Sequence, residues 1–264
     1  LWLNPKQGTD AAVAQAFNHV IFKEFHLEKP SAYFTDYVRR YTDLPMLVLL
    51  EETDKGYKPT RFLRASDLAG DLGQENNPEW KTVAIDSLTD QLVSPLGSIG
   101  YRWGESGKWN IEAREGSEGR DVELRLTQVA ENEAVDVAFP YFGGQLHDHF
   151  QHVEGEEIQY RRVPSRALAL GDGRIARVAT VFDIQAAGLG IDRGLGGEHV
   201  AASYDDASVP GTPAWQEAIT GVSREKIIQV AREFADNADK TRGRSMIIVG
   251  AAMNHWYHMD MNYR

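Results

Sequence analysis

The side chains best placed to do chemistry follow a short apolar run near the end of the chain. Met246 to Val249 are all apolar, which predicts a strand buried on both faces. Gly250-Ala251-Ala252 come next, and such small residues let a ligand approach the backbone closely. Just past the end of this predicted strand follow residues with hydrogen-bonding and stacking side chains, Asn254, His255, Trp256, Tyr257 and His258. Open parallel sheets bind their ligands at this end of their strands. The alternative is a buried strand that runs into an ordinary loop, and spacing leaves both interpretations open.

A second candidate is the connection Asn4-Pro5-Lys6-Gln7-Gly8-Thr9-Asp10. The apolar residues Leu1 to Leu3 indicate the end of a strand before it, and Ala11 to Phe25 carry apolar residues on one helical face after it. The first N–H groups of a helix have no partner inside the helix, so this connection can receive a phosphate or a purine edge. Without further support, the simpler interpretation is a plain capped helix start.

Two further clusters carry titratable groups but favour loops. His147, His149 and His152 have spacing that suits zinc or iron, yet Gly143-Gly144 and charged residues surround them as in an exposed loop. The carboxylates of Asp205 and Asp206 precede a Ser/Pro/Gly segment, which favours turn formation over acid–base chemistry. We therefore predict no metal ligand in the chain.

The composition argues against several kinds of binding and excludes several kinds of site. The 264 residues carry a net charge of −11, which argues against non-specific binding to nucleic acid or to an anionic membrane surface. With no cysteine, the chain has no disulfide, thiolate zinc site or complete cysteine-ligated iron–sulfur cluster of its own. No apolar run approaches the roughly 18 residues that span a bilayer. Because the sequence opens inside an apolar stretch without an initiator methionine, we expect a piece of a longer polypeptide.

The predicted elements divide the chain into three parts. Residues 1–45 read as helical, with a second helix that begins near Ser31. Residues 46–180 alternate short apolar runs with Gly, Pro and Asp breaks, which predicts a β-rich region with a hairpin turn at Gly171-Asp172-Gly173. Residues 181–264 return to helical patterns, including a helix capped by Ser223, and end in the apolar run described above.

Several segments are too specific to be generic. Leu1 to Ala12, Tyr33 to Asp43, Gly73 to Lys81, Gly97 to Gly104, Ile219 to Arg224, Arg232 to Lys240 and Gly243 to Arg264 closely resemble the alpha subunits of membrane-bound respiratory nitrate reductases. These catalytic subunits are part of the molybdopterin oxidoreductase, or dimethyl sulfoxide reductase, family. Gly-Thr-Asp and Ile-Thr-Gly-Val are shared with the wider family, whereas the β-rich middle resembles the nitrate reductase type.

The resemblance implies an α/β fold, in which a parallel sheet with flanking helices, formed by residues 1–45 and 181–264, is interrupted by a β-rich insertion at 46–180. It implies nitrate reduction to nitrite by oxygen-atom transfer at molybdenum held by two molybdopterin guanine dinucleotides. Electrons would come through iron–sulfur clusters from a beta subunit and a membrane gamma subunit, at the cytoplasmic face of the membrane. The cluster of the complete chain would not be ligated by this segment, and the molybdenum ligand also lies outside it.

Site residues are carried over position by position. The stretch Lys6, Gln7, Gly8, Thr9 and Asp10 corresponds to a family segment at a guanine end of the cofactor, where a carboxylate accepts hydrogen bonds from guanine N1 and N2. The loop with Gly250, Ala251, Asn254, His255 and Trp256 corresponds to a cofactor-lining loop, with His255 first and His258 second as the catalytic histidine.

Two alternatives accompany this assignment. The segment is either a scaffold whose insertion docks the beta subunit through Trp103 and Trp109, or part of a relative that reduces another oxyanion such as chlorate or selenate. In each case we expect the segment alone to be inactive.

Overall fold

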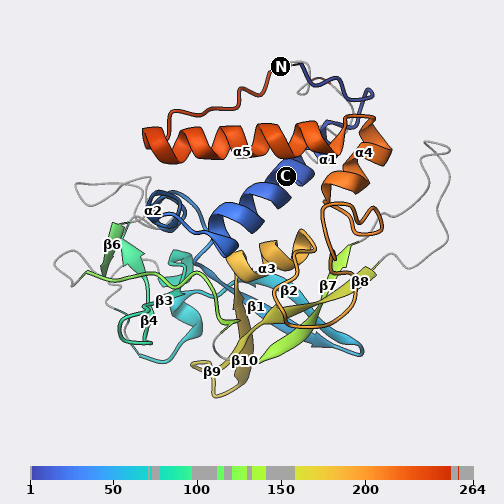
Figure 1. Cartoon of the computed structure of the whole chain (residues 1–264). Coiled ribbons are helices and arrows are strands. Elements are labelled where there is room, and N and C mark those ends of the chain that lie inside the picture. The colour runs from blue at the N-terminus through green and yellow to red at the C-terminus, as the bar shows by residue number, and fades with distance from the viewer. Residues whose placement is uncertain are drawn as a thin grey trace.

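The computed structural model describes residues 2–70, 72, 78–96, 112–115, 121–129, 133–140, 158–250 and 255. A layer of helices lies over one side of a twisted sheet, and helix α3 (Val181–Gly188) lies between them (Figure 1). The α/β class is therefore confirmed. None of the helices in these ranges is long and apolar enough to cross a membrane.

The main sheet has six strands in the order β8-β7-β2-β1-β10-β9. Their bounds are β1 Leu47–Thr53, β2 Gly56–Phe62, β7 Ala134–Pro140, β8 Ile158–Pro164, β9 Arg166–Ala169 and β10 Ile175–Thr180. Only the β2–β7 pair is parallel, and the other four neighbouring pairs are antiparallel. Two small sheets pair β3 (Ala84–Ile85) with β4 (Leu92–Val93) and β5 (Pro95–Leu96) with β6 (Glu112–Glu115).

This sheet lies within the region 46–180 that was predicted to be β-rich, and short turns join two of its antiparallel pairs, β1 with β2 and β9 with β10. The turn at Gly171-Asp172-Gly173 joins β9 to β10, as predicted. The sequence Gly56-Tyr57-Lys58 predicts a turn, but these residues begin β2, in which Tyr57 pairs with Glu52. The alternating residues Val122 to Thr127 predict a strand, but the structure has only a single bridge there, between Leu124 and Asp86. A two-residue hairpin closes β1 onto β2 because it needs no crossover helix.

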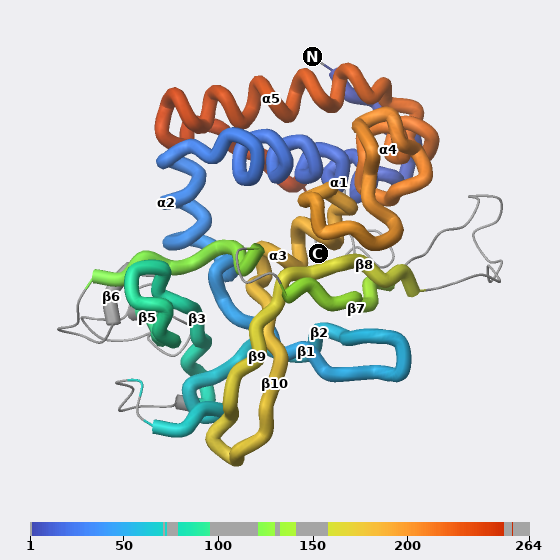
Figure 2. The backbone as a smooth tube through the Cα atoms, turned by 60° about the horizontal axis from the view of Figure 1, so that its bottom comes forward, coloured from blue at the N-terminus to red at the C-terminus, as the bar shows by residue number. Residues whose placement is uncertain are grey.

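The helices come from the two ends of the chain. They are α1 Asp10–Ile21, which continues as the π-helix η1 Phe22–Glu28, then α2 Ala32–Tyr41, α3, α4 Pro213–Thr220 and α5 Arg224–Thr241. Short 3-10 turns occur at η2 Ala65–Asp67 and η3 Pro78–Trp80. Side-chain caps begin four of the α-helices, and the predicted caps Ser31 and Ser223 are both confirmed. Helix α1 packs against α4 and α5, so the helical layer joins residues from both ends of the sequence (Figure 2).

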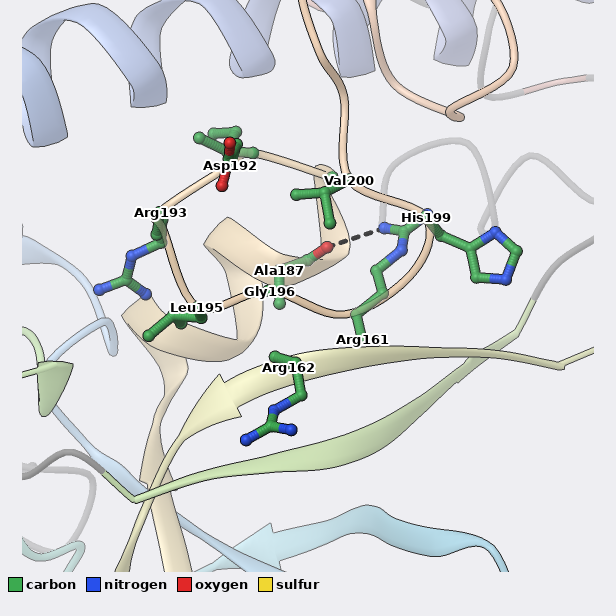
Figure 3. A pocket seen from close by; sticks show the side chains of 11 residues that line it. Arg161, Arg162, Ala187, Asp192, Arg193, Leu195, Gly196, His199 and Val200 are labelled. Carbon is green, nitrogen blue, oxygen red and sulfur yellow. Dashed lines mark hydrogen bonds between the residues drawn. The ribbon is translucent and has the colours of Figure 1, made fainter.

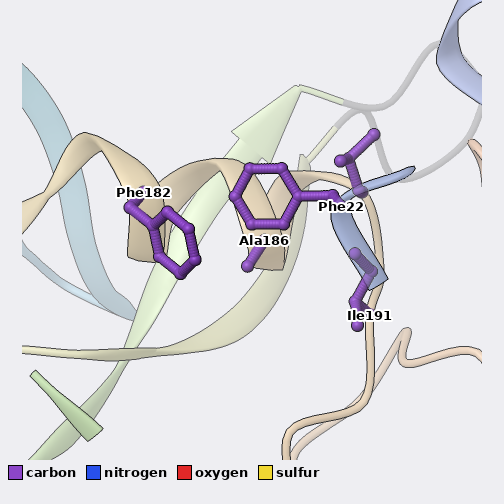
Figure 4. Packing of buried hydrophobic residues seen from close by; sticks show 5 residues of the cluster. Phe22, Phe182, Ala186 and Ile191 are labelled. Carbon is purple, nitrogen blue, oxygen red and sulfur yellow. The ribbon is translucent and has the colours of Figure 1, made fainter. Parts of the chain in front are cut away.

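An apolar cluster connects the helical layer to the sheet. Phe22 of η1 stacks on Phe182 of α3 with ring centroids 4.6 Å apart, and Ala186 and Ile191 fill the space around them (Figure 4). On its other side α3 contributes Ala187 to a cluster with Val137 and Val163 of the sheet. Helix α3 is thus the central packing element, because it buries apolar residues on both of its faces.

The strand predicted at residues 246–249 is not formed. Met246, Ile247, Ile248 and Val249 are 77%, 62%, 80% and 49% exposed, and no strand of the described residues pairs with them. Trp2, in the other predicted strand end, is 80% exposed. The parallel sheet expected from residues 1–45 and 181–264 is therefore absent from the described part of the chain. An apolar strand forms only when neighbours satisfy its backbone groups, and the described residues supply none.

Candidate functional site

The Lys6–Asp10 connection folds into a closed turn at the start of α1. The Thr9 N–H and hydroxyl both donate to the Lys6 carbonyl, at 3.2 and 2.6 Å, and Gly8 takes the left-handed conformation with φ of 76°. Because the Thr9 hydroxyl bonds backward, it makes no cap hydrogen bond to α1. The first turn of α1 thus has no side-chain cap on its N–H groups.

This turn lies against a second motif from the far end of the sequence. The Lys6 N–H donates to the Thr220 carbonyl at 2.9 Å, at the end of α4. Gly221 ends that helix with φ of 75°, and a Cβ added there would lie 3.7 Å from Lys6 Cε. The structure therefore brings together Gly-Thr-Asp and Ile-Thr-Gly-Val, the two motifs shared with the wider family.

A buried polar network fixes the shape of the Thr220 turn. Gln216 Nε2 donates to the Val222 carbonyl at 2.7 Å, and Gln216 Oε1 accepts the Thr220 hydroxyl at 2.9 Å. The Val222 N–H donates to the Thr220 hydroxyl oxygen at 3.0 Å. The side chains of Gln216 and Thr220 are almost fully buried, so the network resists competition from water. Sequence reasoning noted the Ile219 to Val222 motif but assigned it no site role.

Asp10 is the chemically distinctive group of this turn. Its side chain is exposed, and among the described residues it has no hydrogen bond or ion pair. It stands in the first turn of α1, where the helix dipole favours negative charge. Lys6 and Gln7, both exposed, lie beside it. An exposed carboxylate at a helix start without a side-chain cap is suited to a planar ligand edge that offers paired donors and an acceptor.

The second predicted group of site residues is only partly described. Gly250 is exposed and lies outside any helix or strand, and a Cβ there would meet nothing within 4 Å among the described residues, so no close approach requires glycine at this position. His255 lies in an exposed turn. In the described part, no hydrogen bond or ion pair joins either residue to the Lys6–Asp10 turn. Ala251, Asn254, Trp256 and His258 lie outside the described residues, as do His147, His149 and His152.

The Asp205-Asp206 pair forms a turn, as predicted. Asp206 accepts the Ser208 N–H at 3.0 Å and the Ser208 hydroxyl at 2.6 Å, while Asp205 pairs with Arg224 at 2.8 Å. Neighbouring Tyr204 donates its hydroxyl to Glu24 at 2.8 Å, and Arg232 donates to the same carboxylate at 2.6 Å. These contacts cross-link η1 to α5 and to the loop before α4, which is a structural role.

Comparison with known proteins identifies the chain. No family model matches it. It is 59% identical over 265 residues to the respiratory nitrate reductase 1 alpha chain of Escherichia coli (strain K12), which covers the whole of this chain and 21% of that protein. It is 39% identical to the nitrate reductase alpha chain of Bacillus subtilis (strain 168), over the whole of this chain and 20% of that protein. It is 27% identical to the perchlorate reductase subunit alpha of Dechloromonas aromatica (strain RCB), over the whole of this chain and 21% of that protein.

The chain therefore spans about a fifth of the length of the curated relatives it matches. The similarity covers both motifs that meet at Lys6 and Thr220 and the sheet between them. Over its whole length, the chain is homologous to a segment of the respiratory nitrate reductase alpha chains.

Proposed function

We propose that this chain is part of a molybdenum enzyme that reduces nitrate to nitrite, and that it supplies one side of the cofactor cradle. The observation that carries the proposal is 59% identity to a respiratory nitrate reductase alpha chain across all residues of this chain. Because the segment covers 21% of that relative, we expect it to have no activity alone. Turnover of nitrate by the purified segment would contradict this expectation.

The Lys6–Asp10 turn fits the guanine end of a molybdopterin guanine dinucleotide. Asp10 is a free exposed carboxylate, and guanine N1–H and N2–H are the paired donors that a carboxylate accepts. The uncapped N–H groups of α1 suit an anionic or acceptor group of the same ligand. Lys6, Gln7, Gly8 and Thr9 would line this end, with Thr220 fixing the turn through its carbonyl. When bound, the cofactor supplies the molybdenum centre that takes an oxygen atom from nitrate.

The loop after residue 249 would line the cofactor closer to the metal. We propose that Gly250, Ala251, Asn254 and Trp256 form this lining, and that His255, or failing that His258, donates a hydrogen bond to the oxyanion. The exposed position of His255 leaves its ring nitrogens open to such a ligand. No metal ligand is assigned to this segment, because molybdenum and the iron–sulfur cluster would be ligated from other parts of the complete chain.

Nitrate is favoured over other oxyanions by the order of similarity. The relatives of 39% identity or more are all named for nitrate, whereas the perchlorate reductase subunit alpha, at 27%, is matched at the same level as a 26% identical respiratory nitrate reductase subunit. The perchlorate reductase relative supports the second candidate, an enzyme acting on another oxyanion such as chlorate or selenate. A beta subunit with iron–sulfur clusters and a membrane gamma subunit, at the cytoplasmic face, are proposed as partners. The docking role of Trp103 and Trp109 stays a prediction, since both lie outside the described residues.

The first test uses the complete alpha polypeptide with its beta subunit. We expect Asp10→Ala to lose most bound molybdenum and guanine nucleotide, because the carboxylate that accepts the guanine donors is gone. His255→Ala is expected to keep the metal and lose nitrate turnover by about 100-fold, within the range for one general acid–base or hydrogen-bonding group. Metal content, released nucleotide and turnover are measured for each variant.

Asp36→Ala is the matched control for Asp10→Ala. Asp36 is also an exposed carboxylate on a helix, but it lies in the middle of α2 and pairs with Arg40 at 2.6 Å, so its loss should change neither metal content nor rate. If Asp10→Ala and His255→Ala both retain metal and rate, the proposed site residues are wrong and the scaffold role gains support.

We further propose that residues 246–249 form a strand of a parallel sheet in the complete polypeptide. Four consecutive apolar residues that are 49% to 80% exposed here would then be covered. Amide hydrogen exchange at these residues should be fast in the isolated segment and slowed by about 100-fold or more in the complete polypeptide, because strand pairing protects the N–H groups. Equal exchange in both forms would exclude the strand.

A further inference from the structure

A cavity of about 360 Å³ lies between α1, α3, the end of β7 and the loop before α4. Its lining is mostly apolar, and Arg161 of β8 is the only charged side chain among the described residues that line it. The volume falls within the range of small-molecule sites, which combine an apolar lining with a few polar groups. The cavity is separate from the Lys6–Asp10 turn, none of whose residues lines it.

Arg161 brings a buried and incompletely satisfied positive charge to this cavity. The residue is 5% exposed. Its Nη1 donates to the Ala187 carbonyl at 2.8 Å (Figure 3) and to the Gly188 carbonyl at 2.5 Å, and its Nη2 donates to Gln159 Oε1 at 2.9 Å. These three bonds leave two of the five guanidinium N–H groups unused, and the buried Nε has no acceptor.

No carboxylate neutralises this guanidinium in the part of the chain that the structure describes. Burial lowers the pKa of Arg161 to about 10, so the group stays charged at neutral pH. The carbonyls of Ala187 and Gly188 belong to the C-terminal end of α3, which carries about half a negative charge. Neighbouring arginines differ, because Arg193 pairs with Asp183 at 2.7 Å and Arg162 lies 3.8 Å from Asp136. Among the described residues, Arg161 therefore carries a charge that no carboxylate balances and that a ligand can use.

The remaining polar groups of the cavity are three amide side chains. Gln15 and Asn18 reach it from α1 and Gln185 from α3, and all three residues are exposed. Among the described residues, their side chains have no hydrogen-bond partner. The Phe139 ring lies against the guanidinium, with its centroid 5.6 Å from Arg161 Cζ. An aromatic wall, a cation and free amides at the rim are complementary to a planar anion.

A second hollow on Arg161 is too small for such a ligand. It measures about 20 Å³ and is lined by Arg162, Arg193 and His199 (Figure 3). That volume holds about one water molecule. The larger cavity is therefore the one with room for a ligand.

We propose that this cavity binds a small planar organic anion, a carboxylate or a phosphate carried on an aromatic ring. Its oxyanion is held by the Arg161 charge, its ring lies on Phe139 and beside Ile184, and its polar edges are bound by Gln15, Asn18 and Gln185. This inference does not depend on nitrate reduction, because it uses neither the cofactor turn nor His255.

The test measures binding of benzoate, phenyl phosphate and neutral benzamide to the full chain by calorimetry and ligand-observed NMR. Benzoate and phenyl phosphate are expected to bind about tenfold more tightly than benzamide, since only the anions gain the charge-assisted contact. Arg161→Gln should bring benzoate to the level of benzamide, while Arg161→Lys should keep part of the preference. Arg174→Gln is the matched control, because this exposed arginine pairs with Asp172 on a hairpin far from the cavity lining.

Arg161→Gln removes bonds to α3, so circular dichroism must show that the variant is folded. If it is not, Asn18→Ala and Gln185→Ala decide, because both residues are exposed and their side chains have no partner in the described part. Each should weaken 4-hydroxybenzoate, whose hydroxyl supplies the polar edge that benzoate lacks, by about threefold through the loss of one hydrogen bond. Equal affinity for benzoate and benzamide, no binding at millimolar concentration, or binding that the amide variants leave unchanged would each overturn the proposal.

Discussion

Replacing Asp183 by alanine is expected to destabilise the chain by about 3–5 kcal/mol, the range for breaking one side of a buried ion pair. Asp183 is fully buried and accepts hydrogen bonds from Arg193 Nη1 at 2.7 Å, the Thr127 hydroxyl at 2.7 Å and the Gln128 N–H at 2.8 Å. Alanine leaves all three donors without an acceptor. The Arg193 side chain is only 8% exposed, so water cannot readily replace the carboxylate.

The effect should be global because Asp183 joins three parts of the chain. It stands in the first turn of α3, Thr127 and Gln128 precede β7, and Arg193 lies in the loop after α3. Urea denaturation of the wild-type chain and the variant measures the change in unfolding free energy. The double variant Asp183→Leu/Arg193→Met should recover much of the loss, since it removes both charges.

Asp172→Ala is the matched control for this experiment. Asp172 pairs with Arg174 at 2.7 Å, but the two side chains are 51% and 77% exposed. Surface pairs of this kind contribute little to stability, because water and salt screen them. A loss below about 1 kcal/mol for Asp183→Ala would contradict the proposed importance of the buried pair.

Lowering the pH from 7.5 to 5 is expected to cost about 4 kcal/mol of stability through the buried His19 and the half-buried His26. Burial lowers the pKa of His19 and of His26 to about 4, from an ordinary value of 6.5. Between these values the unfolded chain binds protons that the folded chain does not, so stability falls as pH decreases. At pH 5 each histidine accounts for about 2 kcal/mol of the loss, and the loss is complete below pH 4.

Both environments explain why the neutral ring is preferred. His19 is 1% exposed, and its Nδ1 lies 2.8 Å from the Leu189 carbonyl, so Nδ1 carries the hydrogen of the neutral imidazole. His26 lies among Phe22, Phe34 and Phe182, with ring centroids 5.4, 5.2 and 6.4 Å away. A charged imidazolium in either place loses its hydration without gaining an acceptor.

Denaturation at a series of pH values measures this effect, and His26→Phe separates the two histidines. Phenylalanine fits among the same aromatic rings without titrating, so the variant should lose about half of the pH dependence between 6.5 and 4.5. Paired carboxylates change the stability at lower pH than the histidines do. Hydrogen bonds from Arg61 and Arg166 hold the pKa values of Asp67 and Asp90 below 3.8, so their contribution is lost only near pH 4 and below. An unchanged slope in His26→Phe would show that His26 is not buried in its neutral form.

Much of the candidate site was predictable because its parts are local. The helix start at Asp10, the Ser31 and Ser223 caps, the left-handed Gly221 and the hairpin at residues 171–173 depend on residues close in sequence. The resemblance to nitrate reductase alpha subunits was likewise carried by short segments, and the comparisons confirmed it. These features need no knowledge of the partners across the fold.

Contacts between distant segments were decided only by the tertiary structure. No periodicity predicts that the Lys6 N–H donates to the Thr220 carbonyl. Nor does it predict that Asp183 of α3 and Arg161 of β8 are buried. For the apolar residues 246–249, the sequence-based prediction fails because distant neighbours are missing. Their composition predicts a buried strand, yet burial requires neighbouring strands that the described residues do not provide. The sequence by itself determined the local turns, the caps and the family. The tertiary structure decided which polar groups are buried and which remain free to bind a ligand, because burial and pairing depend on residues far apart in the chain.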